Sequence, residues 1–205
     1  MEMKERIQLK AEELFKRYGI RSVTMDEISY QLGISKKTLY QSFTDKEEIV
    51  TAVFDRMMDD NKSRCIADKD NSDNAIHEVF LAFDNVLQMF TEMNPAILFD
   101  LQKYHPNVYV KFNSYKYEFL YNVIKENLER GVKEELYRPE INIDIITRFR
   151  IESSMLPFNT ELFPQSKKDL AGVERELLQH FLFGLATTKG TKLIQKYIQQ
   201  RLKQQ

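Results

Sequence analysis

The sequence predicts an all-α protein, and three observations support this prediction. The 205 residues include only 6 Gly and 5 Pro, while Leu, Lys, Glu, Gln and Met, which favour helix, are abundant. Apolar residues recur at helical spacing along most of the chain. No segment shows the alternating pattern of a strand over sufficient length. With 42% hydrophobic and 30% charged residues the chain can bury a core, and we expect about nine helices.

A first helix is predicted at the amino end, because apolar residues there repeat on one face and stop near Gly19. A glycine suits the left-handed conformation that often ends a helix. The apolar face consists of Ile7, Ala11, Leu14, Phe15 and Tyr18.

Two very short helices are predicted next, in the arrangement of a helix-turn-helix. Thr24 is a good N-cap and Glu27, three residues later, completes a capping box, so one helix begins there and ends at Gly33. Ser35 caps the second helix after the short turn 32–34. Two brief helices joined in this way must cross steeply rather than lie antiparallel.

The second short helix, residues 36–43, is predicted to contact DNA. Leu39 and Phe43 are four residues apart and face inward, whereas the outer face holds two lysines and no acid. In such motifs this helix enters the major groove and neighbouring donors bind phosphates. A merely solvated helix face is the alternative, and the two caps, the glycine and the acid-free face disfavour it. The candidate residues here are Ser35, Lys36, Lys37, Thr38, Tyr40 and Gln41.

A further phosphate contact is predicted at the start of the next helix, which Asp45 or Thr44 caps. Lys46 lies in its first turn, where unpaired N–H groups and the helix dipole also favour an anion. The net charge of −1 excludes nucleic-acid binding through bulk positive charge, so such binding depends on this local surface.

About 45 residues carry a specific pattern, which consists of the first helix, Gly19, Val23, Thr24, Ile28, residues 32–36 and 38–40, Phe43, Lys46, Glu47 and Ile49. This pattern resembles the TetR family of bacterial transcriptional regulators. The resemblance implies phosphate contacts for Thr24, Tyr40 and Lys46, and groove contacts for Lys36, Lys37, Thr38 and Gln41. Ser29, where the family commonly has Ala, is a small departure. Residues 183–187 are similar to a segment before the final helix of many members.

The resemblance also implies a division of the chain and a mode of action. Residues 1–49 would form the three-helix DNA-binding domain, and residues 50–205 a larger helical domain for effector binding and dimerisation. A homodimer would bind a palindromic operator, with repression as the family default and effector-dependent activation as an alternative. The effector would be a small apolar or amphipathic molecule.

The larger region shows further helical stripes. The clearest consists of Ile76, Phe80, Phe83, Leu87 and Phe90, and Asn94-Pro95 ends it. A long helix is expected from His105-Pro106 to about Gly131, a shorter one around residues 145–152, and two more over residues 170–185 and from residue 191 onward. Pro157 and Pro164 bracket a loop.

The last two helices are expected to pair with their mates in a dimer. Small Gly184 and Ala186 would let helices approach closely, although the same stripe could instead pack within its own subunit. The candidate interface residues are Leu177, Phe181, Gly184, Leu185, Ile194 and Tyr197.

Residues 76–163 are unusually rich in aromatic side chains, which can line an elongated apolar cavity or fill an ordinary core. The candidate pocket residues are Phe83, Phe90, Phe99, Phe112, Tyr115 and Phe149. Arg148 and Glu152 share a helix face, and Arg150 follows Phe149. These charges could orient an anionic or amphipathic ligand, or form a surface pair.

Other classes of protein are disfavoured. None of the common catalytic or phosphate-binding motifs is present, and His77, His105, His180 and Cys65 form no ligand pattern, so no metal, cofactor or catalytic residue is expected. A lone cysteine and the charged amino end indicate a cytoplasmic protein without a membrane span. A non-catalytic helical adaptor would explain residues 50–205 and leave the first 49 unexplained. The operator, the regulated genes and the effector are not encoded in any recognisable pattern.

Overall fold

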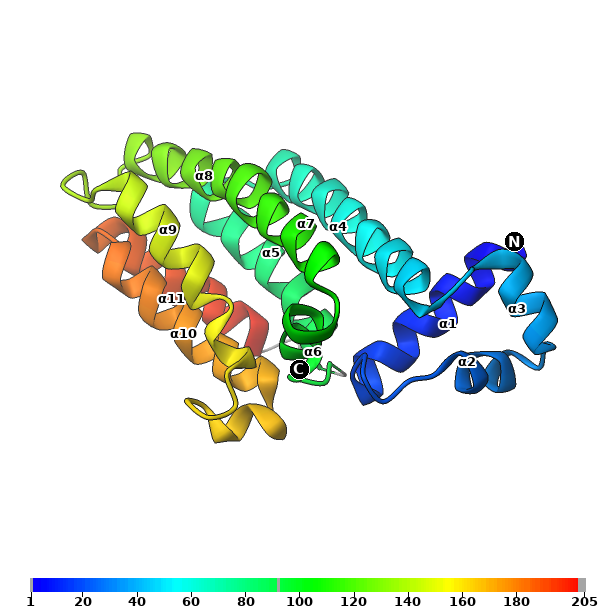
Figure 1. Ribbon diagram of the computed structural model, residues 1–205. Coiled ribbons are helices and arrows are strands. Elements are labelled where there is room, and N and C mark those ends of the chain that lie inside the picture. Colours follow the sequence, from blue (N-terminus) through cyan, green and yellow to red (C-terminus); the bar gives the residue numbers. More distant parts are fainter. Residues whose placement is uncertain (1, 92, 203–205) are drawn as a thin grey trace. The chain divides into compact units, whose positions relative to one another are not determined.

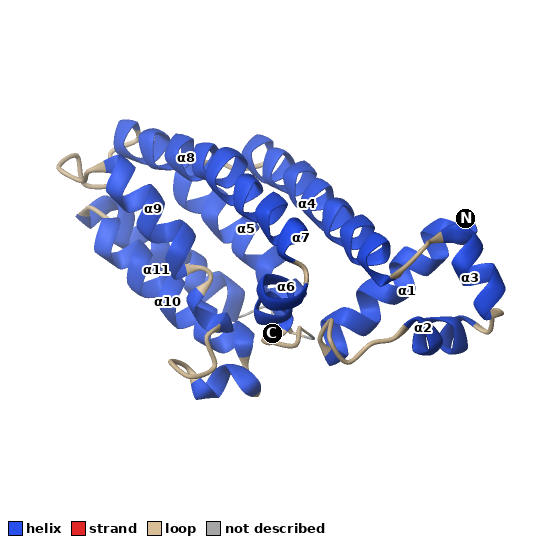
Figure 2. Ribbon diagram, viewed as in Figure 1, coloured by secondary structure: helices blue, strands red, loops and turns tan. Residues whose placement is uncertain are grey.

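A computed structural model describes residues 2–91 and 93–202, and the regular elements within these ranges are helices (Figures 1 and 2). The only strand-like feature there is an isolated bridge between Tyr137 and Ala186. The all-α prediction is therefore confirmed. No helix in the described part of the chain combines the length and apolar character needed to cross a membrane.

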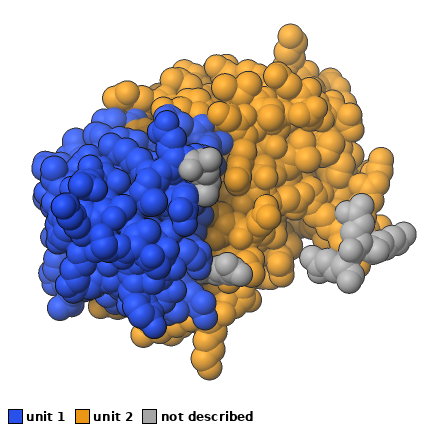
Figure 3. Space-filling view, turned by 90° about the vertical axis from the view of Figure 1, so that its right-hand side faces the viewer, with its two compact units in different colours: residues 1–61, 92–114 blue, residues 62–91, 115–205 orange. Residues whose placement is uncertain are grey.

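The chain divides into two compact units, coloured separately in Figure 3. Unit 1 comprises residues 1–61 and 92–114, and unit 2 comprises residues 62–91 and 115–205. Helix α4 (Lys46–Asp70) contributes to both units. This division does not test the functional boundary expected between residues 49 and 50, which stays a prediction.

Unit 1 contains α1 (Met3–Tyr18), α2 (Met25–Leu32), α3 (Lys36–Ser42), the first part of α4, α6 (Ile97–Tyr104) and α7 (Pro106–Ser114). Its core includes Ile7, Ala11, Leu14, Phe15, Ile28, Leu39, Phe43 and Ile49, all buried. The predicted stripe of the first helix is thus confirmed except for Tyr18, which is 46% exposed. Helix α6 was not predicted, because the motifs Asn94-Pro95 and His105-Pro106 that bracket it indicated only breaks in the chain.

Unit 2 is a helical bundle built around α5 (Ala75–Phe90). It also contains the π-helical segment η1 (Tyr115–Leu120), α8 (Tyr121–Lys133), α9 (Ile143–Ser153), the short 3₁₀ segments η2 (Leu156–Phe158) and η3 (Pro164–Lys167), α10 (Leu170–Leu185) and α11 (Thr188–Leu202). Helices α5, α8, α10 and α11 bury a common core that includes Ile76, Phe80, Phe83, Leu128, Leu178, Leu182 and Ile194. The stripe predicted on α5 is therefore a core face. Helix α7, segment η1 and helix α8 follow one another without a break.

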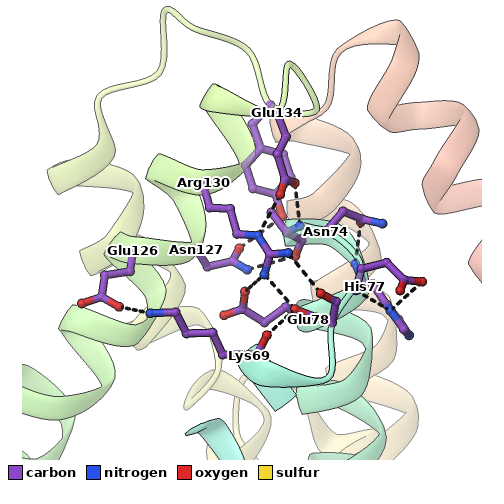
Figure 4. Close-up of polar contacts among 12 residues, drawn as sticks. Lys69, Asn74, His77, Glu78, Glu126, Asn127, Arg130 and Glu134 are labelled. Atoms are coloured by element: carbon purple, nitrogen blue, oxygen red, sulfur yellow. Dashed lines mark hydrogen bonds and ion pairs between the residues drawn. The ribbon is translucent and has the colours of Figure 1, made fainter. Parts of the chain in front are cut away.

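A polar network ties the turn before α5 to α8 (Figure 4). The Arg130 guanidinium donates to Glu134 at 2.8 Å, to Glu78 at 3.1 Å and to both the hydroxyl and the carbonyl of Ser72. Asn127 in turn donates to the carbonyl of Ala75 at 2.9 Å. Because these buried and half-buried groups have hydrogen-bond partners, the network stabilises the bundle.

Candidate nucleic-acid interface

Helix α2 begins and ends where the sequence predicts. The Thr24 hydroxyl accepts a hydrogen bond from the Glu27 N–H at 3.1 Å, and Gly33 ends the helix in the left-handed conformation with φ 63°. The capping box is only half formed, because the Glu27 carboxylate accepts from Gln31 at 2.8 Å instead of from the backbone of Thr24.

Helix α3 presents the predicted polar face to solvent. The Ser35 hydroxyl caps it by accepting from the Thr38 N–H at 3.1 Å. Leu39 and Phe43 are buried, at 0% and 1% exposure, so the opposite face of α3 points toward solvent. Lys36, Lys37, Tyr40 and Gln41 are exposed there, with Ser35 and the cap residue Thr24 also exposed and Thr38 half-buried. A helix held by its apolar side in this way can offer its outer side chains to a groove.

The surface around α3 carries one acid that sequence analysis missed. Lys36 belongs to α3, and its ammonium group donates to the carboxylate of Asp26, on α2, at 2.7 Å. This hydrogen bond raises the pKa of Lys36. The recognition helix itself holds no acid, but the surface it shares with α2 does. The local sequence pattern does not indicate that Lys36 and Asp26 are paired, because the turn between α2 and α3 decides which of their side chains meet.

Lys46 has a different environment from the one expected of a phosphate ligand. Its ammonium group is half-buried and donates to the backbone carbonyl of Ile20 at 2.6 Å. Burial lowers the pKa of Lys46, and the negative charge of Asp100 opposes that shift. In this arrangement Lys46 joins α4 to the end of α1, so a phosphate contact would require the side chain to leave its carbonyl partner.

The first turn of α4 is occupied by carboxylates. Asp45 caps the helix by accepting from the Glu48 N–H at 2.9 Å, which confirms one of the two expected caps. The Glu48 carboxylate accepts from both the backbone and the hydroxyl of Thr44, and these bonds lower the pKa of Glu48. The predicted anion site at this helix end is thus flanked by acids, which oppose a phosphate.

Helix α6 supports the helix-turn-helix within unit 1. The carboxylate of Asp100, 6% exposed, accepts from the backbone N–H of Arg21 at 2.8 Å, and the residues are 79 apart in sequence. The ring of His105 bonds to the carboxylate of Glu47 on α4. No sequence signal identified Asp100 or His105, because their roles depend on a contact between distant segments.

Comparison with known proteins agrees with this geometry. Residues 9–53 match the family model described as bacterial regulatory proteins, tetR family. This match covers the larger part of α1, all of α2 and α3, and the first turns of α4. Residues 9–53 therefore form a domain of the tetR family of bacterial regulatory proteins.

Full-length relatives extend the similarity of this chain beyond the matched domain. It is 26% identical over 183 residues to an uncharacterized HTH-type transcriptional regulator, YvaF, of Bacillus subtilis, covering 88% of this chain and 94% of that protein. A TetR-family regulator from Marinobacter aquaeolei superimposes with a TM-score of 0.71 at 16% identity, covering 96% of this chain and 99% of that one. Thermus thermophilus FadR, a TetR-family repressor in complex with lauroyl-CoA, gives 0.56 at 16% identity, covering 90% and 95%. The solved structures share the fold. The family match over residues 9–53, together with the Bacillus subtilis relative, identifies a DNA-binding transcriptional regulator.

The six aromatic residues predicted to line a pocket are divided between the units. Phe99, 55% exposed, and the half-buried Phe112 belong to unit 1, whereas Phe83, Phe90, Tyr115 and Phe149 belong to unit 2. Within unit 2, Phe83 lies in the common core and Phe90 meets Phe158 edge-on at 5.0 Å. A pocket formed by these rings stays a prediction.

Four of the predicted dimer residues have a different role from the one expected. Phe181, Leu185, Ile194 and Tyr197 are buried in the core of unit 2, because their face of α10 and α11 packs on α5. The stripe therefore packs within its own subunit, as the alternative interpretation held, while Leu177 is half-buried and Gly184 exposed. The exposed face of α10 instead carries Glu176, His180, Phe183 and Gly184.

Proposed function

We propose that this TetR-family regulator binds a palindromic operator as a homodimer and represses transcription until a small effector releases it. The observation that carries the proposal is the exposure of Lys36, Lys37, Tyr40 and Gln41 on a helix whose opposite face is buried. In a major groove, the lysines and the Gln41 amide can reach base edges, while Tyr40 can donate to a phosphate. Residues 1–49 would then act as the DNA-binding domain.

Two copies of α3 are needed because one short helix reads too few base pairs. A two-fold pair reads two half-sites in successive major grooves, which multiplies selectivity. The outward face of α10 supports such pairing: Phe183 is 40% exposed, and a Cβ atom at Gly184 would meet nothing within 4 Å beyond its own turn of helix. A glycine that the subunit's own packing does not require is well suited to the close approach of a partner helix.

Effector release would act through linkage between two conformations. A ligand that binds more tightly to the conformation with wrongly spaced recognition helices must weaken DNA binding by the same factor. The lauroyl-CoA bound by the Thermus thermophilus relative supports an amphipathic effector. Helix α6 and the residue after it offer a physical route within unit 1, since Asp100 bonds to the backbone of Arg21 before α2 and His105 bonds to Glu47 on α4.

The decisive experiment is selection of bound duplexes from a random pool with the full-length chain. The expected result is an inverted repeat whose half-site spacing matches a two-fold dimer, with affinity that falls steeply as salt rises. A reporter placed behind the recovered site then separates repression from activation. If no inverted repeat were recovered, the proposed operator would be wrong. If the affinity for duplex DNA did not change with salt concentration, the proposed contacts between the lysines of α3 and DNA would be wrong.

A further inference from the structure

Arg150 on α9 and Glu174 on α10 form a buried ion pair in unit 2. One terminal guanidinium nitrogen, Nη2, lies 2.7 Å from Glu174 Oε1, and the side chains are 15% and 1% exposed. Burial raises the pKa of Glu174, and the charge of Arg150 opposes the shift. Two charges placed this deep need good geometry and further hydrogen bonds to offset their desolvation.

The pair lacks those further bonds. Arg150 Nη1 and Glu174 Oε2 are buried and have no hydrogen-bond partner among the described residues. A contrasting pair occurs in the same unit. Arg201 Nε donates to Asp84 Oδ1 at 3.0 Å, and Arg201 Nη2 donates to Asp84 Oδ2 at 2.5 Å. Arginine and carboxylate frequently form two parallel hydrogen bonds of this kind. Because Arg150 and Glu174 share only one bond, Arg150 Nη1 is left as an unused donor and Glu174 Oε2 as an unused acceptor.

An aromatic ring lies beside the guanidinium group of Arg150. The Arg150 guanidinium carbon lies 5.5 Å from the centre of the Phe181 ring, and Phe149 stacks on Phe181 at 6.3 Å. Phe149 is 53% exposed and Phe181 is buried, so one ring of this stacked pair reaches solvent. A flat molecule could lie against these rings while its polar end reaches the pair.

We propose that Arg150 and Glu174 anchor the polar head of the effector, and that this head is a neutral group with one acceptor and one donor, such as a carboxamide. The acceptor would receive Arg150 Nη1–H and the donor would bond to Glu174 Oε2. The pair has no net charge, so a charged head would leave one buried charge uncompensated. This inference rests on the proposed ligand response and specifies the chemistry of its ligand.

Three aromatic compounds of similar shape but different charge test whether the site prefers a neutral head group. Benzamide is neutral with a donor and an acceptor, benzoate is an anion and benzamidine is a cation. Saturation-transfer NMR on the full-length protein without DNA, together with thermal unfolding, measures their binding. We expect benzamide to bind and to raise the unfolding midpoint with concentration, and the two ions to bind about tenfold more weakly or less, as sites built for specific hydrogen bonds reject poor matches.

A double variant tests the residues. Arg150→Met with Glu174→Leu nearly keeps the volume and removes every polar side-chain atom of the pair, a replacement that cores commonly tolerate. We expect it to fold and to lose benzamide binding. The matched control, Arg201→Met with Asp84→Leu, removes the pair that is joined by two bonds and should bind benzamide as the unmodified protein does.

Three results would overturn the assignment: no binding of benzamide at millimolar concentration, equal binding of all three compounds, or unchanged binding by a folded Arg150→Met/Glu174→Leu variant. Because binding is measured without DNA, failure here is distinct from failure of the operator proposal. Benzamide binding with no effect on operator release would keep the site and reject its link to regulation.

Discussion

The Lys36 ammonium group lies 2.7 Å from the carboxylate of Asp26, so an acid on α2 is bonded to a cation of the recognition helix. Both side chains are more than half exposed. A phosphate approaching Lys36 must therefore compete with a carboxylate that also repels it. We infer that Asp26 limits the affinity of this protein for DNA.

Replacement Asp26→Asn should raise DNA affinity by about 3- to 10-fold at low salt, because it frees Lys36 and removes one negative charge near the phosphates. Mobility-shift titrations at several salt concentrations measure the change. Glu126→Gln is the matched control, since it breaks an equivalent exposed bond to Lys69, also 2.7 Å, in unit 2. Affinity that stays the same or falls in Asp26→Asn would contradict the inference.

Substitutions of the exposed side chains of α3 should have two kinds of effect on DNA binding: some weaken it on every sequence, and others also change the preferred sequence. Tyr40→Phe removes one phosphate donor and should weaken binding by roughly 3- to 10-fold on every duplex. Lys37→Ala and Gln41→Ala should also change the preferred sequence, because base contacts contribute about 1–3 kcal/mol of discrimination each. Duplex selection with each variant distinguishes the classes. If none of the three variants changed affinity or preference, α3 would not be the recognition helix.

Asp100 should stabilise the helix-turn-helix from α6. Asp100→Ala leaves the N–H of Arg21 without its partner and removes the charge that favours protonated Lys46. We expect a loss of about 1–3 kcal/mol in the free energy of unfolding, together with weaker DNA binding. Urea denaturation measures the loss.

The control for Asp100 is Asp55→Ala, which removes an exposed bond to Lys111 at 2.9 Å in the same unit. Exposed pairs contribute about 0–1 kcal/mol, so this variant should change little. Equal effects of the two substitutions would reject a special role for Asp100.

The buried pair of Arg150 and Glu174 should give a defined pH dependence. Because burial raises the pKa of Glu174, folding favours its protonated form, and that contribution to stability is lost as pH rises from the ordinary glutamate pKa through the raised value. Relative to Arg150→Met/Glu174→Leu, the unmodified protein should lose stability over this window and be less stable by about 1–4 kcal/mol at neutral pH. Denaturation at stepped pH measures the difference, and a slope of opposite sign would refute it.

Gly184 should control dimerisation without affecting the subunit fold. Gly184→Arg places a long side chain in open space on α10, so the subunit should stay folded, but a partner helix could no longer approach. We expect the dimer dissociation constant to rise at least about tenfold, which corresponds to about 1.4 kcal/mol. Sedimentation equilibrium measures it, with Lys133→Arg, at an exposed position on α8, as the control. An unaltered dimer would place the interface elsewhere.

The helix-turn-helix could be predicted from sequence because its signals are local. Thr24, Gly33 and Ser35 set helix ends through bonds to residues within four positions, and Leu39 and Phe43 fix one face by their spacing. The same rules could not assign α10 correctly. Periodicity indicates an apolar face but not what covers it, so Phe181 and Leu185 were expected at a dimer surface and instead lie in the core of unit 2.

The order of the amino acids by itself determined the helical class, the ends of α2 and α3 and the polar face of the recognition helix, because these depend on hydrogen bonds and side-chain spacing within a few residues. Only the tertiary structure decided that Asp26 bonds to Lys36, that Asp100 holds the backbone at Arg21, and that Arg150 and Glu174 meet in the interior. Each of these contacts joins groups from different elements. Their partners are set by how the helices pack, which no local pattern specifies.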